Sequence, residues 1–177
     1  MRLHNDEGMA DHAAYVHGGT DAREVARLEK QADFTAGRTF SALGFTKGGK
    51  VLDLACGHGR HARFFAGRLQ SHFPGVEVVG LDLSSAQLAA SRVGHPRLPV
   101  IRGDATRLPF ADETFGAVHC SWLLEHVPDP LAVLREVRRV LEPGARCHFI
   151  EVDNATLALS PQSEAVDEVM RRLNAAQ

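Results

Sequence analysis

Residues 51–59 read Val-Leu-Asp-Leu-Ala-Cys-Gly-His-Gly, and they are the strongest indication of the fold of the chain. A short apolar run that contains Asp53 breaks into a glycine turn, and residues with helical spacing follow at once. A strand, a glycine turn and a helix N-terminus together place backbone N–H groups and the positive end of a helix dipole beside a cleft. Because an acid precedes the glycines, the loop suits a ligand with a cationic or hydroxyl-rich part, and not only a phosphate.

Strand and helix patterns alternate from this stretch towards the C-terminus. Strands are expected at 50–54, 76–81, 99–102, 116–121 and 146–152, with helices between them at 59–71, 84–92 and 130–141. Ser84 is the expected N-cap of the second of these helices, and Pro143-Gly144 is expected to end the third. The alternation predicts an α/β fold with a Rossmann-like parallel sheet and helices on both of its faces.

Helical spacing also precedes the stretch at 20–43, with Thr20 and Asp21 as candidate N-caps, and an amphipathic segment follows at 161–175. Residues 1–19 are rich in Gly, His, Asp and Asn without periodicity, so we expect a flexible N-terminal arm. The remaining residues, 20–177, are expected to form one domain.

The composition is that of an ordinary soluble globular protein. The 177 residues are 44% hydrophobic and 24% charged, and the formal net charge is −2. The sequence contains no Lys/Arg cluster, no apolar run near the ~20 residues that span a bilayer and no apolar signal-peptide core. We therefore expect a cytoplasmic protein without nucleic-acid or membrane partners. Three cysteines in apolar contexts (Cys56, Cys120, Cys147) are expected to be buried thiols.

The glycine turn fits a dinucleotide pattern that also serves other adenine nucleosides. Residues 57–62 match G-x-G-x-x-G/A, and Asp82 ends the second strand 25 residues after Gly57. An acid at that place accepts hydrogen bonds from the ribose hydroxyls of an adenosine. Asp53 would repel a pyrophosphate but suits the ammonium of an amino-acid tail. Asp104, after the third strand, suits the exocyclic amine of adenine. A nicotinamide cofactor is therefore the weaker of the two alternatives.

Five ordered motifs extend this interpretation, namely VLDLACGHGR, VVGLDLS, GDATRLPFADETFGAV, SWLLEHVPDP and LREVRRVLEPGARCHFIEV. With them the chain resembles the class I S-adenosylmethionine-dependent methyltransferases, of the small-molecule type related to the ubiquinone and menaquinone biosynthesis enzymes. The resemblance runs from about Glu24 to Asp153. It implies a class I methyltransferase fold, S-adenosylmethionine as cofactor, and methyl transfer to O, N or C of a small molecule by in-line displacement.

The resemblance also implies which residues touch the cofactor. Asp53 would lie near the methionine amino group, Asp82 would bind the ribose hydroxyls, and Leu83 would pack on the adenine. Two departures from the family pattern are Ala55, in place of the usual first glycine, and Gly116, in place of a frequent acid. The full implied cofactor set is Asp53, Ala55, Cys56, Gly57, Gly59, Asp82, Leu83, Asp104, Ala105, Ser121 and Trp122.

Candidates for the acceptor side are fewer and each has a plain alternative. His126, after the fourth strand, is the candidate base or substrate contact, with a packed loop residue as the alternative. His58 and His61 are expected to face solvent or to cap the helix. No spacing typical of a metal site is present. The candidate lid and substrate residues are Tyr15 and His17 on the arm, Arg27 and Gln31 on the N-terminal lid helix 20–43, and Glu151 at the end of the fifth strand.

The family's sheet usually continues into an antiparallel pair after the fifth strand and its helix, and no such pair is expected here. A shortened chain, a partner subunit over the sheet edge and a homodimer through that edge are the three explanations. The alternative function is a non-catalytic or partner-dependent subunit that binds S-adenosylmethionine, and an NAD-dependent oxidoreductase is a third.

Overall fold

A computed structural model describes residues 22–44, 49–152 and 163–175, and its centre is a single sheet of five parallel strands. The strands are β1 (Lys50–Leu54), β2 (Glu77–Asp82), β3 (Val100–Arg102), β4 (Phe115–Ser121) and β5 (Leu141–Ile150). Their order across the sheet is β3-β2-β1-β4-β5. The predicted fold class is confirmed, and the first four strands lie within one residue of their expected positions.

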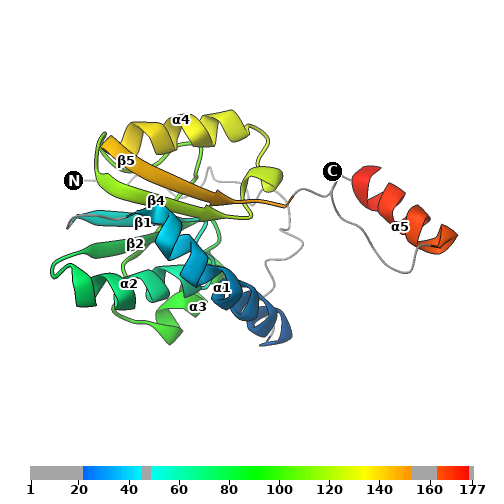
Figure 1. Cartoon of the computed structure of the whole chain (residues 1–177), viewed down its shortest axis with the longest axis horizontal. Coiled ribbons are helices and arrows are strands. Elements are labelled where there is room, and N and C mark those ends of the chain that lie inside the picture. The colour runs from blue at the N-terminus through cyan, green and yellow to red at the C-terminus, as the bar shows by residue number, and fades with distance from the viewer. Residues whose placement is uncertain (1–21, 45–48, 153–162, 176–177) are drawn as a thin grey trace.

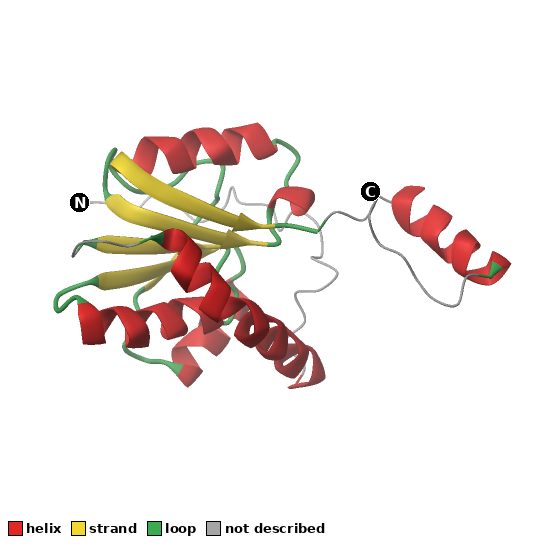
Figure 2. Ribbon diagram, viewed as in Figure 1, coloured by secondary structure: helices red, strands yellow, loops and turns green. Residues whose placement is uncertain are grey.

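Helices cover both faces of the sheet (Figures 1 and 2). Helices α1 (Ala22–Leu43), α2 (Arg60–His72) and α3 (Ser85–Gly94) lie on one side, and α4 (Pro130–Val140) lies on the other. The period of two along the strands explains the two layers. Val51 packs with Phe65 of α2 in one apolar cluster, whereas its neighbour Leu52 packs with Val133 of α4 in the other.

The strand order creates a switch point between β1 and β4. The chain moves outward from β1 through β2 to β3 and then returns to β4 on the other side of β1, and β1 and β4 pair in parallel. In open α/β sheets, ligands bind at the carboxyl ends of the strands beside such a point. The residue after each of these two strands has a positive φ, 56° at Ala55 and 54° at Trp122. Non-glycine residues rarely adopt this conformation, and it tends to occur at functional sites.

The C-terminal part of the sheet differs from the sequence-based expectation. Strand β5 begins at Leu141 rather than at 146, so Pro143 and Gly144 lie inside the strand instead of before it. The register explains this: Phe115 pairs with Leu141 but Ala117 pairs with Arg146, so β5 bulges between these pairs. A bulge accommodates the proline, and Gly144 has a φ of +78°.

Two further features concern the outer elements. Cys147 is exposed on β5, because an edge strand has one side without a neighbouring strand in the described sheet, so the expectation of three buried thiols is wrong for this residue. Helix α5 (Glu164–Ala175) lies apart from the other elements in Figure 1. None of the helices in the described part of the chain is long and apolar enough to cross a membrane.

Candidate functional site

The glycine turn after β1 has the backbone conformation that its sequence requires. Gly57 and Gly59 have φ values of +51° and +72°, in the left-handed region that glycine adopts without strain. Gly59 is also the N-cap residue of α2. A Cβ at Gly59 would lie 2.6 Å from Ser91 Oγ and 3.0 Å from Leu98 Cδ2, so α3 and the segment after it approach the turn closely. Conformation and space together leave room only for glycine there.

Asp53 lies inside the protein, beneath this turn. Its side chain is 2% exposed, and Oδ2 accepts a hydrogen bond of 2.8 Å from the backbone N–H of Ala62 in the first turn of α2. Burial raises the pKa of Asp53 to about 7, the Ala62 N–H opposes the shift, and the charge of Asp82 adds to it. A carboxyl group with a pKa near neutrality ionises readily when a cation arrives.

Asp82 at the end of β2 joins the glycine turn to the next loop. Its Oδ2 accepts from Gly57 N–H and its Oδ1 accepts from Ser84 N–H, both at 2.8 Å. Burial raises the pKa of Asp82, and the hydrogen bonds from Ser84 and Gly57 oppose this shift. The adjacent Leu83 is 43% exposed. A carboxylate with remaining lone pairs therefore stands beside an exposed apolar side chain.

Asp104, after β3, extends the row of acids along the same edge of the sheet. It is exposed, and its Oδ1 accepts from both the backbone N–H and the hydroxyl of Thr106 at 2.8 Å. Ala105 beside it is almost fully buried. The second carboxylate oxygen, Oδ2, is the acceptor that this arrangement leaves for an amine.

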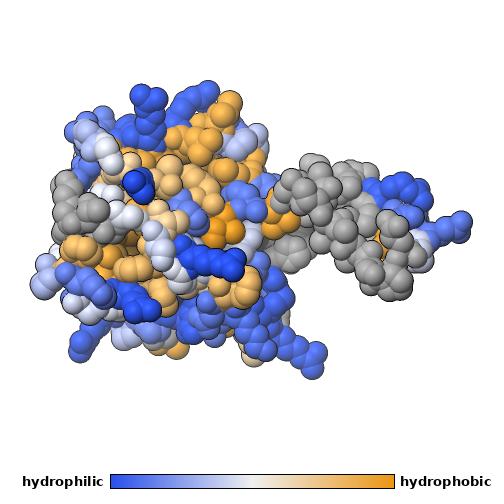
Figure 3. Space-filling model, in the orientation of Figure 1, coloured by the Kyte–Doolittle hydropathy of each residue, from blue (hydrophilic) through white to orange (hydrophobic). Residues whose placement is uncertain are grey.

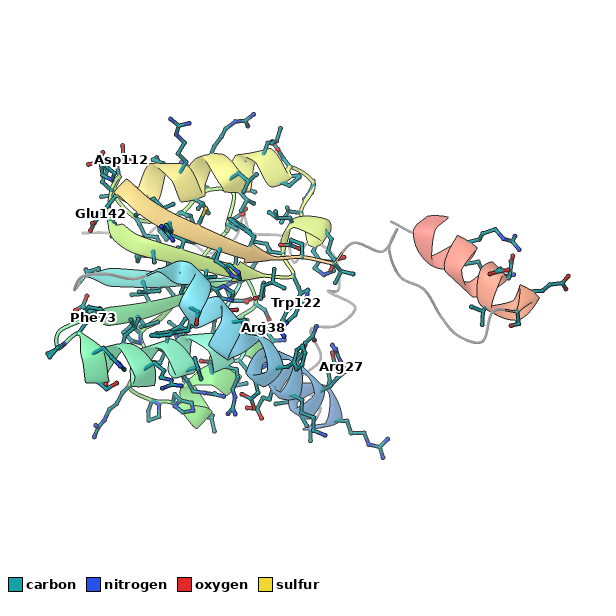
Figure 4. The ribbon with its side chains drawn as sticks, in the orientation of Figure 1. Arg27, Arg38, Phe73, Asp112, Trp122 and Glu142 are labelled. Carbon is teal, nitrogen blue, oxygen red and sulfur yellow. The ribbon has the colours of Figure 1, made fainter. Side chains whose placement is uncertain are left out.

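The loop after β4 is held by its own backbone bonds to β5. Trp122 N–H donates to the Ile150 carbonyl at 2.7 Å. Glu151 Oε1 accepts from Leu123 N–H at 3.2 Å and from Leu124 N–H at 3.1 Å. Figure 4 shows Trp122 at the carboxyl ends of the strands. Glu151 therefore holds the start of the short 3-10 helix η1 (Leu124–His126), a role that the sequence did not indicate.

The structure does not bring the candidate acceptor residues into one cluster. His126 ends η1, with Nε2 3.5 Å from Glu125 Oε1 and about a third of its side chain exposed. Arg27 donates to Gln31 Oε1 at 3.1 Å and also bonds to Glu24, so these side chains are tied together along α1. The predicted lid residues Tyr15 and His17, and the candidate caps Thr20 and Asp21, lie outside the described residues.

The expectation that His58 and His61 face solvent or cap the helix is wrong. Each is only 7% exposed, because α1 packs across the start of α2. His61 Nε2 lies 3.0 Å from Thr35 Oγ1 of α1, and burial lowers the pKa of His61 to about 4. His58 Nε2 is buried, and no residue in the described ranges forms a hydrogen bond with it. Burial also lowers the pKa of His58.

Two further histidines, missed in the sequence, join His61 beneath the loop after β4. His119 on β4 and His148 on β5 are register partners, with ring centroids 5.7 Å apart, and His119 lies 4.6 Å from His61. We call His61, His119 and His148 the histidine floor. Side chains alternate between the two faces of a strand, and this alternation along 117–121 could have indicated that His119 points into the core on the same face as Ala117. Within the described ranges, no group of three or more His, Cys, Asp or Glu residues is arranged to hold a metal ion.

The chemistry of this edge fits S-adenosylmethionine. The Asp82 carboxylate suits ribose hydroxyls, the exposed Leu83 suits an adenine face, and Asp104 Oδ2 suits the adenine amine. The positive charge that S-adenosylmethionine carries in its ammonium and sulfonium groups suits the buried Asp53. A pyrophosphate at the glycine turn would lie near the buried carboxyl group of Asp53, which would repel it. The arrangement therefore fits a cationic nucleoside better than a dinucleotide.

Comparisons with known proteins agree with this geometry. A family model described as a methyltransferase domain matches residues 52–149. The demethylmenaquinone methyltransferase of Mycolicibacterium paratuberculosis is 43% identical over 123 residues, which are 68% of this chain and 50% of that protein. The chain thus spans about half the length of the curated relatives it matches.

Solved structures give the same result for the fold. A SAM-dependent methyltransferase from Aquifex aeolicus aligns with a TM-score of 0.64 at 17% identity, and the alignment covers 87% of each chain. A complex of the Haloferax volcanii Trm112 methyltransferase activator with a methyltransferase aligns with a TM-score of 0.59 at 25% identity. That alignment covers 71% of this chain and 56% of the other.

Proposed function

Because this chain belongs to the methyltransferase domain family, we propose that it transfers a methyl group from S-adenosylmethionine to a small-molecule acceptor. One observation carries the proposal. The acid at the end of β2 is hydrogen-bonded to the glycine turn after β1, at the switch point of the sheet, and the buried Asp53 beneath that turn suits a cationic group better than a pyrophosphate.

The cofactor supplies the methyl group together with its own leaving group, so the chain's residues have to bind, orient and exclude water. We propose that Asp82 and Leu83 bind the adenosine, that Asp104 and Ala105 contact the edge of the adenine, and that the charge of Asp53 offsets that of the cationic end.

The backbone and the end of β4 complete the proposed contacts. The positive-φ residue Ala55 and its neighbours Cys56, Gly57 and Gly59 allow the backbone to approach the ligand. Ser121 and Trp122 border the reacting end. His126 remains the candidate base for an acceptor that must lose a proton.

The N-terminal region completes the proposed site. The first turns of α1 lie towards the carboxyl edge of the sheet in Figure 1, and Arg27 and Gln31 are on these turns. We propose that α1 acts as a lid helix, with Arg27 near the carboxylate of the cofactor. Tyr15 and His17 are proposed to close the site from the segment that precedes α1.

Isothermal titration calorimetry with S-adenosylmethionine and with NAD tests the cofactor assignment. Micromolar binding of the first, without binding of NAD, is the expected result. Formation of S-adenosylhomocysteine in the presence of acceptors then tests transfer. Demethylmenaquinone, which the names of the matched relatives specify, is the first acceptor to try. A chain that binds the cofactor but never turns over with any acceptor or partner would support the non-catalytic alternative.

The outer edge of β5 belongs to the same proposal. Apolar residues gather over α4 and β5 in Figure 3, and Leu131, Leu134 and Val152 are 59%, 38% and 47% exposed. Unpaired strand edges and apolar patches are normally covered. We propose that a partner subunit or a second copy of the chain covers this edge in the active protein. Light scattering at several protein concentrations tests for the second copy, because a dimer would double the mass.

A further inference from the structure

A hydrogen bond connects the ligand-facing end of β4 to the histidine floor. Ser121 Oγ lies 2.8 Å from His119 Nε2. Ser121 is the partly buried last residue of β4, whereas His119 is 0% exposed. The two residues are two positions apart on one strand and therefore share a face of the sheet. The Ser121 hydroxyl thus connects the buried ring of His119 to the edge of the sheet at which the strands end.

Aromatic neighbours fix the orientation of this ring. The centroid of His119 lies 4.6 Å from that of His61, 5.3 Å from that of Phe65 and 5.7 Å from that of His148. The Phe65 ring stands edge-on at 87°, and the His148 ring is stacked at 22°. Rings packed in this way cannot turn without displacing neighbours. The hydroxyl of Ser121 therefore has a partner whose position is set before any ligand arrives.

The floor adds no positive charge beneath the site. Burial, followed by the neighbouring His61 and His148, lowers the pKa of His119 to about 2. Burial also lowers the pKa of His61 to about 4 and shifts the pKa of His148 downward. All three rings are neutral at neutral pH. A neutral floor tolerates a cation above it, whereas a protonated imidazole would repel one.

The hydroxyl keeps acceptor capacity in either form of the neutral ring. If Ser121 donates to Nε2, both lone pairs of its oxygen are available; if Nε2–H donates to the hydroxyl, one lone pair remains. The acids of the same edge also keep lone pairs for a ligand, but backbone groups hold them in place. Each oxygen of Asp82 accepts from one backbone N–H, and one oxygen of Asp53 accepts from the N–H of Ala62.

We propose that His119 is a positioning residue of the methyl-transfer site, and that its ring holds the Ser121 hydroxyl so that the oxygen faces the positively charged sulfonium end of the cofactor. This inference rests on the proposed function. Its consequence is a preference for charge: the site binds S-adenosylmethionine more tightly than S-adenosylhomocysteine, whose sulfur is neutral. The neutral product would then leave more easily than the charged cofactor.

The test is the ratio of the two affinities, measured by calorimetry on the full 177-residue chain at pH 7.5. Ser121→Ala removes the hydroxyl, and Ser121→Thr keeps it. His119→Phe keeps a ring but removes the hydrogen bond. His148→Phe is the matched control, because His148 is the register partner of His119 and stacks on it, whereas the Ser121 hydroxyl is bonded to the ring of His119.

We expect Ser121→Ala and His119→Phe to lower the affinity for S-adenosylmethionine relative to that for S-adenosylhomocysteine by about three- to tenfold. Ser121→Thr and His148→Phe should keep the parent ratio. If His119→Phe does not fold, the affinity ratios of Ser121→Ala and Ser121→Thr still test the inference. An unchanged ratio in Ser121→Ala, or an equal fall in His148→Phe, overturns the inference. If neither ligand binds the parent chain, the proposed function itself is wrong.

Discussion

The ends of β1, β2 and β3 carry carboxyl groups, whereas the end of β4 rests on neutral imidazole rings. In the first half of the edge, Asp53 is fixed by a backbone N–H of helix α2, and Asp82 is fixed by backbone N–H groups of the glycine turn and of the loop after β2. In the second half, Ser121 is fixed by the side chain of His119, which is itself held by other side chains. The backbone donors that hold Asp53 and Asp82 are in place once the glycine turn and its neighbouring segments have formed. The ring of His119 is held only when α2, β4 and β5 have packed together.

The two halves of the edge show where charge is useful in a site for a cationic ligand. The acidic half of the edge (Asp53, Asp82 and Asp104) supplies negative charge within a short distance of the glycine turn, and burial keeps the pKa of Asp53 near neutrality. The histidine half (Ser121 and the histidine floor) supplies polarity without charge, because burial lowers the pKa of each of its rings. The acidic half is thus suited to attract the ligand, and the histidine half is suited to orient it.

The largest expected effect concerns the backbone of the acidic half. Gly59→Ala places a Cβ at a φ of +72° and 2.6 Å from Ser91 Oγ, so we expect unfolding to become easier by about 3 kcal/mol. Gly67→Ala in α2 is the control, since nothing lies within 4 Å of its Cβ and alanine favours a helix. Urea denaturation followed by circular dichroism measures both. Equal stability of the two variants would contradict the close approach at Gly59.

The next effect concerns the charge of the acidic half. Asp82→Ala removes a carboxylate that binds two backbone N–H groups and is proposed to hold the ribose, so S-adenosylmethionine should bind about a hundredfold more weakly. Glu77→Ala changes an acid at the opposite end of the same strand, where an exposed ion pair with Lys50 contributes little, and should leave binding unchanged. Tight binding by Asp82→Ala would remove the acidic half from the cofactor site.

The sequence predicts the acidic half well and the histidine half poorly. The strand, the glycine turn and Asp53 are encoded within a few residues of one another, and Asp82 follows 25 residues after Gly57 at the end of the next strand, so motif spacing locates them. The floor joins His61, His119 and His148 from α2, β4 and β5, and these residues come together only when the three elements pack against one another.

The start of β5 was missed for a similar reason. Pro143 and Gly144 look like a helix end followed by a turn, but pairing with β4 and a bulge draw them into the strand. Pairing between strands is a tertiary contact, and it overrides the local preference of the two residues.

The two halves should respond to pH in opposite directions. The folded pKa of His119, about 2, lies below its unfolded value of about 6.5, so its contribution to stability is present above pH 6.5 and is lost on acidification. The folded pKa of Asp53, about 7, lies above its unfolded value of about 4, so its contribution is present below pH 4 and is lost as pH rises through 7.

Variants separate these contributions between pH 7 and pH 5. His119→Phe should lose roughly 2 kcal/mol less stability than the parent over this range, and Asp53→Asn should lose roughly 2 kcal/mol more. Denaturant midpoints at half-unit pH steps measure all three. Parallel profiles for the parent and His119→Phe would show that His119 titrates alike in the folded and unfolded chains.

The smallest expected effect lies in the loop that joins the two halves to the acceptor side. Glu151→Ala removes the acceptor of the Leu123 and Leu124 N–H groups and should cost about 1 kcal/mol, whereas Glu151→Gln keeps an oxygen there and should cost less. Trp122 is the single tryptophan of the chain and precedes these residues, so its fluorescence reports on the loop directly. A red shift is expected for Glu151→Ala and not for Glu151→Gln, because the indole gains water when the loop loosens. An unshifted spectrum in Glu151→Ala would mean that the bond between Trp122 N–H and the Ile150 carbonyl holds the loop by itself.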